Sequence, residues 1–137
     1  MHHCLHIRPG EGIGPIHLGM RPNEIVSVFT EPQTYEEWMG GNLNDSLLFQ
    51  GLILEFSACD SYAPLPDSTL VSVTIFQRRD ACLFERFIAD WNKASLIEKL
   101  KAQGYALQTP SNGDIIVPGQ LSLSFDEEER LIWVDIP

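Results

Sequence analysis

The six residues Met20-Arg21-Pro22-Asn23-Glu24-Ile25 recur in similar form as Trp91-Asn92-Lys93-Ala94-Ser95-Leu96, 71 residues further along the chain. Both copies predict the start of a short amphipathic helix. Pro22 suits the first helical position, and Asn92 suits the N-cap of the second helix. Gly104 stands where the second helix should end. The chain therefore contains a repeated helix signal.

Strand signals follow each predicted helix. The expected strands are residues 47–56, which contain the apolar run Leu52–Phe56, and Leu70–Phe76 after the first helix, and residues 120–125 and Leu131–Ile136 after the second. Residues 126–129 should join the last two strands as a hairpin. One further strand lies either at residues 105–109 or at Ile115–Val117, and residues 80–90 are compatible with a helix or an extended start.

The order of these signals predicts an α+β fold made of two tandem helix-then-antiparallel-strand repeats. The first repeat covers about residues 13–78, the second covers about residues 83–137, and residues 1–137 form one domain. A unit of this size buries little surface alone, so the two sheets should join or pack, with the helices on one side of the antiparallel sheet. The expected core aromatic residues are Phe29, Phe56, Phe76, Phe125 and Trp133.

Charge is the most unusual property of the composition. The 137 residues carry 9 Lys and Arg against 19 Asp and Glu, a formal net charge of −10. Residues 22–77 contain no Lys or Arg and carry the acids Glu24, Glu31, Glu36, Glu37, Asp45, Glu55, Asp60 and Asp67. A field of one sign over half of a small domain repels nucleic acid and favours a basic partner.

The sequence also argues against a membrane or secreted protein. No apolar run approaches the roughly 20 residues of a membrane helix, and the first residues form no apolar secretory signal. The three cysteines, Cys4, Cys59 and Cys82, are odd in number and form no C-x-x-C, which is typical of reduced thiols. We therefore expect a cytoplasmic protein.

Candidate metal and catalytic residues are sparse. The only cluster of soft ligands is His2, His3, Cys4, His6 and His17. It lacks the spacings of structural zinc sites, so we expect no metal and no cofactor, and whether the N-terminus chelates a metal stays open. The glycine-rich residues 10–20 lack the Lys-Ser/Thr of a phosphate loop, and no G-x-S-x-G or H-E-x-x-H occurs. The sequence thus predicts that the protein is not an enzyme.

The segment Ile13-Gly14-Pro15-Ile16-His17-Leu18-Gly19-Met20-Arg21-Pro22-Asn23-Glu24-Ile25, followed by a strand pair, resembles a known helix start. The pattern G-M-S/T-x-x-E-V occurs in small bacterial lipoproteins of outer-membrane assembly and, as a tandem repeat, in secreted β-lactamase inhibitor proteins. Arg21 stands where these families usually have a capping Ser or Thr. Cys4 lacks the apolar segment that precedes a lipidated cysteine, so the lipoprotein role does not carry over. The resemblance implies a fold whose known members bind proteins and catalyse nothing.

These observations favour a small acidic protein that binds and inhibits a basic protein, most concretely a bacterial immunity protein that neutralises a basic toxin. Aromatic residues ringed by carboxylates in loops are typical of a binding hot spot against such a partner. The expected partner-binding residues are Glu36, Glu37, Trp38, Asp45, Asp60, Tyr62 and Asp67. The alternative is an enzyme or a small-ligand-binding protein that uses the cleft between the repeats, with Cys59 or His17 near it. The sequence leaves the partner's identity and the oligomeric state open.

Overall fold

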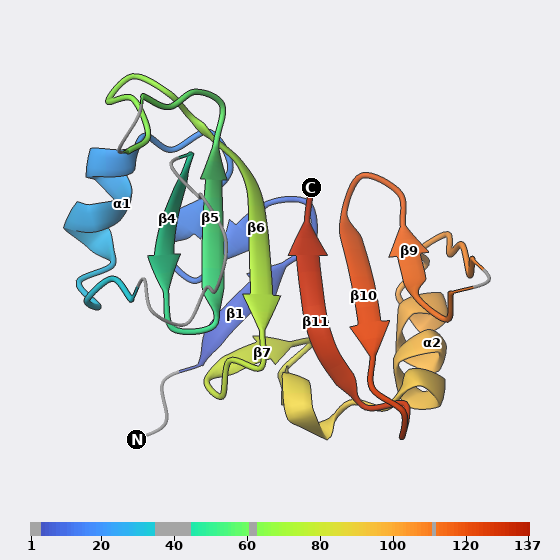
Figure 1. The fold of residues 1–137 in the computed structure, drawn as a ribbon. Coiled ribbons are helices and arrows are strands. Elements are labelled where there is room, and N and C mark those ends of the chain that lie inside the picture. The colour runs from blue at the N-terminus through green and yellow to red at the C-terminus, as the bar shows by residue number, and fades with distance from the viewer. Residues whose placement is uncertain (1–3, 35–44, 61–62, 111) are drawn as a thin grey trace.

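A computed structural model describes residues 4–34, 45–60, 63–110 and 112–137, and it is built around a six-stranded sheet (Figure 1). In spatial order the sheet consists of β4 (Ser46–Phe49), β5 (Leu52–Phe56), β6 (Leu70–Phe76), β11 (Leu131–Ile136), β10 (Leu121–Phe125) and β9 (Ile115–Val117). Every neighbouring pair is antiparallel. The pairing of β6 with β11 joins the two halves of the chain in one continuous sheet.

A second sheet of five short strands contains β3 (Ile16–His17), β2 (Gly12–Ile13), β1 (Leu5–Arg8), β7 (Ala81–Leu83) and β8 (Arg86–Phe87). Its centre is the parallel pairing of β1 with β7, which brings together segments from the two halves of the chain. Only glycine fits at position 12, because a Cβ atom there would lie 2.0 Å from the carbonyl oxygen of Ile16. The close approach of β2 and β3 therefore depends on this residue.

Two α-helices, α1 (Pro22–Val28) and α2 (Lys93–Ala102), occur among the described residues, with a 3-10 turn, η1, at Ile88–Asp90. The sequence-based predictions of both helices are confirmed. The side chain of Asn92 accepts a hydrogen bond from the backbone N–H of Ser95 at 2.8 Å, and thus caps α2. Neither helix has the length and apolar character needed to cross a membrane.

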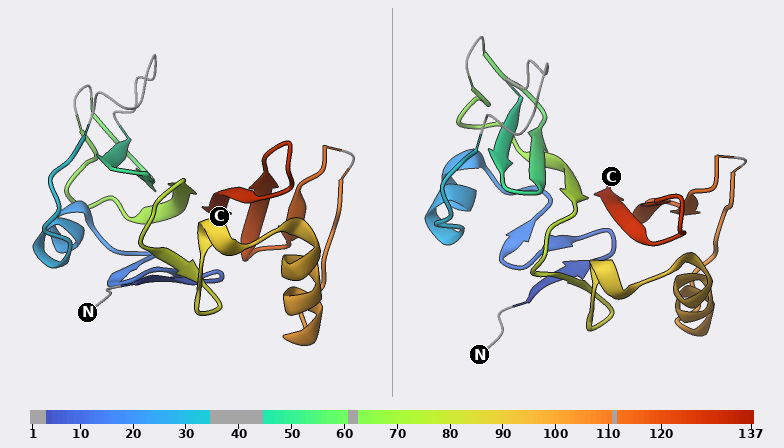
Figure 2. Two further views of the ribbon diagram at one scale, coloured as in Figure 1. Left: turned by 90° about the horizontal axis from the view of Figure 1, so that it is seen from below. Right: turned by 60° about the horizontal axis from the view of Figure 1, so that its bottom comes forward.

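The core lies between the two sheets. Seen from below, the five-stranded sheet lies under the six-stranded sheet, while α1 and α2 stand on opposite sides of the molecule (Figure 2). One buried cluster takes side chains from both sheets and both helices, among them Ile13, Leu83, Ile75, Val134 and Leu96. The indole Nε1 of Trp91 donates a hydrogen bond to the carbonyl of Leu83 at 2.8 Å inside this core.

The expected α+β fold of two tandem helix-then-strand repeats, with helices covering one side of the sheet, is wrong. The structure is mostly β, with 40% strand and 17% helix, and the five-stranded sheet packs on the face that was assigned to helices. Residues 5–17 and 81–87 form strands of two to four residues, too short for a readable alternation of apolar and polar side chains. The parallel partner of β1 lies in the other half of the chain, where no local pattern can indicate it.

Candidate functional site

The face of the six-stranded sheet that looks away from the core is open over β6, β10 and β11. Val73 and Ile75 of β6 and Val134 and Ile136 of β11 are fully buried, while the residues between them on each strand are partly exposed. This face is turned toward the viewer in Figure 1, and no described helix or strand covers it. Strand alternation therefore presents a second set of side chains to solvent.

An aromatic pair lies on this open face. Phe76 and Trp133 are cross-strand partners, with ring centroids 4.9 Å apart and an angle of 56° between the rings. Asp135 orients the pair, since it accepts hydrogen bonds from Trp133 Nε1 at 3.0 Å and from Thr74 Oγ1 at 2.7 Å. A partly exposed tryptophan with a fixed orientation is a suitable contact residue for another protein.

The assignment of Phe76 and Trp133 to the core is therefore wrong, because each side chain points to the face that the five-stranded sheet does not cover. Phe29 and Phe56 are buried as expected, and Phe125 packs against the core while partly exposed. A large aromatic residue in a strand indicates burial on average, but only the register decides which face it occupies.

The ionised groups on the open face are acidic. Glu55 of β5 pairs across the sheet with Ser72 and is exposed, and Asp135 of β11 lies opposite Thr74. Among the strand residues that the structure describes on this face, none is a Lys or an Arg. The face thus combines aromatic surface with negative charge.

The predicted partner-binding residues Asp45, Asp60 and Asp67 lie at one end of this sheet, where β4 begins and β5 ends. The carbonyl of Asp45 accepts the N–H of Phe56 at 2.7 Å, and its carboxylate accepts the hydroxyl of Ser46 at 3.0 Å. Asp60 accepts the N–H of Ala63 at 2.9 Å, and both it and Asp67 are exposed. The other predicted residues, Glu36, Glu37, Trp38 and Tyr62, lie outside the described residues.

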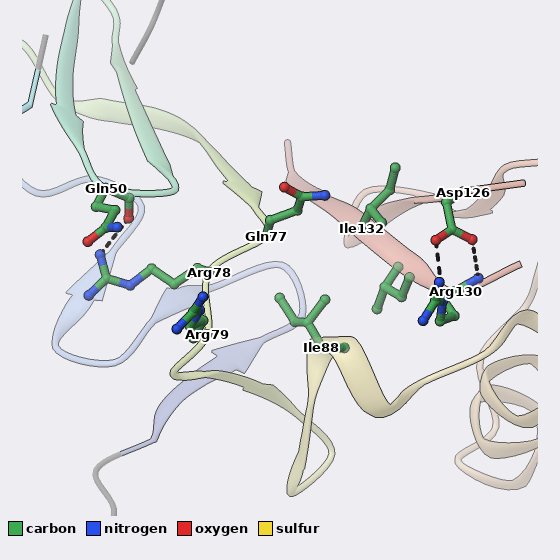
Figure 3. A pocket seen from close by; sticks show the side chains of 10 residues that line it. Gln50, Gln77, Arg78, Arg79, Ile88, Asp126, Arg130 and Ile132 are labelled. Carbon is green, nitrogen blue, oxygen red and sulfur yellow. Dashed lines mark hydrogen bonds and ion pairs between the residues drawn. The ribbon is translucent and has the colours of Figure 1, made fainter. Parts of the chain in front are cut away.

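A pocket of about 540 Å3 lies at the opposite end of the sheet, between the two halves of the chain (Figure 3). It is bounded by the β4–β5 turn, the β6–β7 connection, η1 and the β10–β11 hairpin. Its lining residues are Gln50, Gln77, Arg78, Arg79, Ile88, Ala89, Asp126, Arg130, Leu131 and Ile132. Cys59 and His17, the residues expected beside a cleft between the two halves, are not among them. Cys59 lies in the connection between β5 and β6, and His17 lies on β3.

Arg78 is a structural anchor at one wall of this pocket. Its guanidinium donates hydrogen bonds to both oxygens of Glu31, to the carbonyl of Gln50 at 2.7 Å and to Asp80 at 2.7 Å. Burial works to lower the pKa of Arg78, but the hydrogen bonds that its guanidinium donates to Glu31 and Asp80, together with their negative charges, outweigh burial and raise it. The side chain is only 8% exposed, so its charge is fully engaged inside the protein.

The β10–β11 hairpin forms the opposite wall. The carboxylate of Asp126 accepts the backbone N–H groups of Glu128 and Arg130, both at 2.9 Å, and pairs with the guanidinium of Arg130 at 3.4 Å. The N–H of Arg130 is the main cause that lowers the pKa of Asp126. Arg130 also pairs with Glu128 at 2.7 Å, so on each wall one guanidinium is paired with two carboxylates.

The sequence contains a local signal for the pocket arginines and another for the exposed aromatic pair. Arg78-Arg79 ends the stretch without cations and stands one residue after a predicted strand. In Leu131–Ile136, period-two alternation puts Trp133 and Asp135 on the face opposite Val134 and Ile136.

No group of three or more His, Cys, Asp or Glu that could hold a metal ion occurs in the part of the chain that the structure describes, which excludes His2 and His3. All three thiols are free: Cys59 is exposed, and Cys82 is buried beside Cys4.

Comparison of the chain with family models, with curated proteins and with solved structures gives no match.

Proposed function

We propose that the protein binds and inhibits a basic protein through the open face of its six-stranded sheet. The observation that carries this proposal is the partly exposed Phe76–Trp133 pair on a face whose described charged strand residues, Glu55 and Asp135, are both acidic. The most concrete form is an immunity protein that neutralises a basic toxin in the cytoplasm.

The aromatic pair supplies the contact energy. Tryptophan is among the residues that contribute most to protein interfaces, especially where neighbouring contacts exclude water. The hydrogen bond to Asp135 restricts the indole before binding, so little conformational entropy is lost when a partner covers it. A basic partner that covers the indole would also meet the carboxylate of Asp135, which lies at the edge of the ring.

The acidic end of the sheet would attract a basic partner electrostatically as it approaches. Asp45, Asp60 and Asp67 lie beside Glu55 at the end where β5 finishes, in a chain with a net charge of −10. Exposed charges of this kind increase the association rate of an oppositely charged partner, and their effect weakens with salt. Glu36, Glu37, Trp38 and Tyr62, which lie outside the described residues, stay predicted contacts of the partner.

Two further considerations support the proposal. The odd number of free thiols suits a reducing compartment such as the cytoplasm. The resemblance of residues 13–25 to inhibitor proteins adds the expectation of a protein partner.

The test begins with the protein immobilised and exposed to lysate of its source cell at low salt. A retained basic protein is identified and purified, and its affinity is then measured by calorimetry at several salt concentrations. We expect Trp133→Ala to weaken binding by about 30-fold, the loss of a hot-spot contact of about 2 kcal/mol. Glu55→Lys should weaken binding mainly through the association rate and should reduce its salt dependence.

The matched control is Glu98→Lys, which makes the same change of charge on α2, away from the open face. It should leave the affinity within about twofold. Equal effects of Glu55→Lys and Glu98→Lys, together with an unchanged affinity of Trp133→Ala, would contradict the proposed surface.

A further inference from the structure

We propose that the pocket between the two halves of the chain binds a small organic monocarboxylate with an apolar body. This site is separate from the open sheet face, and it would give the protein a small-molecule ligand in addition to a protein partner.

The first step of the argument is the contrast between two adjacent arginines. Arg78 donates to Glu31, Asp80 and the carbonyl of Gln50, and it is almost fully buried. Arg79 is exposed, lines the pocket, and has no hydrogen bond or ion pair with the described residues. The guanidinium of Arg79 is therefore available to a ligand, and its planar array of donors suits the two oxygens of a carboxylate.

The backbone conformation explains why Arg78 is buried while Arg79 is exposed. Gln77 adopts a left-handed conformation with φ of 50°, and its N–H donates to the carbonyl of Ile132 at 3.1 Å. This turn ends β6 and sends the next two side chains in different directions. Gly51 allows Arg78 to pack against the β4–β5 turn, because a Cβ atom at position 51 would lie only 3.0 Å from the Cβ atom of Arg78. Arg79 is left at the mouth of the pocket.

The second step is the apolar surface beside Arg79. Figure 3 places Ile88 and Ile132 between Arg79 and Arg130, and Ala89 and Leu131 complete this part of the lining. Ile88 and Leu131 are each 2% exposed and lie beneath the pocket, so the apolar surface open to a ligand comes from Ala89, which is exposed, and Ile132, which is partly exposed. A volume of about 540 Å3 is in the range of small-molecule sites. The ligand should therefore carry an aliphatic or aromatic body next to its charge.

The third step is the sign and size of the ligand's charge. Around the pocket, the carboxylates of Glu31, Asp80, Asp126 and Glu128 are each paired with Arg78 or Arg130. The guanidinium of Arg79 is the one charge of this group that lacks a partner among the described residues. Together with the guanidinium groups of Arg78, Arg79 and Arg130, these four carboxylates give the surroundings a formal net charge of −1, so a dianion would be repelled more strongly than a monoanion that pairs with Arg79. This favours a carboxylate over a phosphate.

The experiment uses hexanoate as the probe and follows the backbone amide shifts of the full chain by two-dimensional NMR. We expect saturable shifts centred on residues 77–79, 88–89 and 130–132, with affinity on the order of millimolar for so small a ligand. Hexanamide, which keeps the apolar body and lacks the charge, should bind at least about tenfold more weakly. Inorganic phosphate should cause no saturable shift in these residues.

Arg79→Gln should weaken hexanoate binding at least about tenfold while leaving the protein folded, because the side chain is exposed. Lys101→Gln removes one positive charge from the exposed end of α2 and should bind hexanoate as the wild type does. Trp133→Ala should also keep hexanoate binding, so a failure of the protein-binding proposal would be distinguishable from a failure of this one.

Three results would overturn the inference. The first is equal binding of hexanoate and hexanamide, which would show an apolar pocket without charge recognition. The second is tighter binding of phosphate than of hexanoate. The third is an equal loss of affinity in Arg79→Gln and Lys101→Gln, which would show a response to net charge only.

Discussion

At the scale of single residues, Arg78 and Arg79 should differ sharply in their effect on stability. Arg78→Ala removes a nearly buried guanidinium and leaves Glu31 and Asp80 without their partner, so we expect a loss of about 3 kcal/mol in the free energy of unfolding. Arg79→Ala should change it by less than about 0.5 kcal/mol, because the side chain is exposed and makes no described bond. Urea denaturation measures both, and equal effects would contradict the different roles assigned to them.

The buried thiol of Cys82 predicts a pH dependence at the same scale. Burial raises the pKa of Cys82 to about 12, with a further rise from the neighbouring Cys4 thiol. An unfolded chain releases this proton near pH 8.5, so stability is unaffected below about pH 8 and decreases as the pH rises from about 8.5 toward 12. Cys82→Ala should have lower stability overall and a flatter decline over this range.

Alkylation gives an independent measurement for the thiols. Cys59 is exposed and should react with iodoacetamide in the native protein, whereas Cys82 should react only after denaturation. Labelling of Cys82 at the rate of Cys59 under native conditions would contradict the burial of β7.

At the scale of elements, the cap of α2 should contribute measurably to stability. Asn92→Ala removes the hydrogen bond from the N–H of Ser95 and should reduce the free energy of unfolding by about 1 kcal/mol. Asn23→Ala replaces an exposed asparagine inside α1 and should be neutral or slightly stabilising, since alanine has the higher helix propensity. Thermal denaturation of the two variants compares a capping asparagine with one that has no such role.

The β10–β11 hairpin should respond to acid. Hydrogen bonds from Arg130 and Glu128 lower the pKa of Asp126, so this group contributes stability above its unfolded pKa of about 3.9. That contribution is lost as the pH falls through the lower, folded value. Asp126→Ala should therefore lose stability at neutral pH and show a smaller further loss in acid than the wild type.

At the scale of the whole molecule, the pairing of β6 with β11 should make unfolding cooperative. The central strands of the six-stranded sheet come from different halves of the chain, and one buried cluster spans both sheets. We expect tryptophan fluorescence and far-ultraviolet circular dichroism to report a single, coincident urea transition. Two separated transitions would show that the halves unfold independently.

Local features of this protein were determined by its sequence alone. Both helices and the strands β6, β10 and β11 correspond to predicted segments, because caps, glycine and apolar periodicity act over a few neighbouring residues. The strand predicted at residues 47–56 is divided into β4 and β5, and β9 is one of the two segments between which the sequence left the choice open. The excess of acidic residues and the stretch without cations are likewise properties of the chain itself.

Only the tertiary structure decided which surfaces these elements present. The parallel pairing of β1 with β7 built a second sheet on one face of the first, and this left Phe76 and Trp133 on the uncovered face. The same packing placed Arg78 between two carboxylates and left Arg79 beside Ile88 at the pocket. Such contacts join residues far apart in the sequence, and their energies depend on burial and on partners that no local pattern specifies.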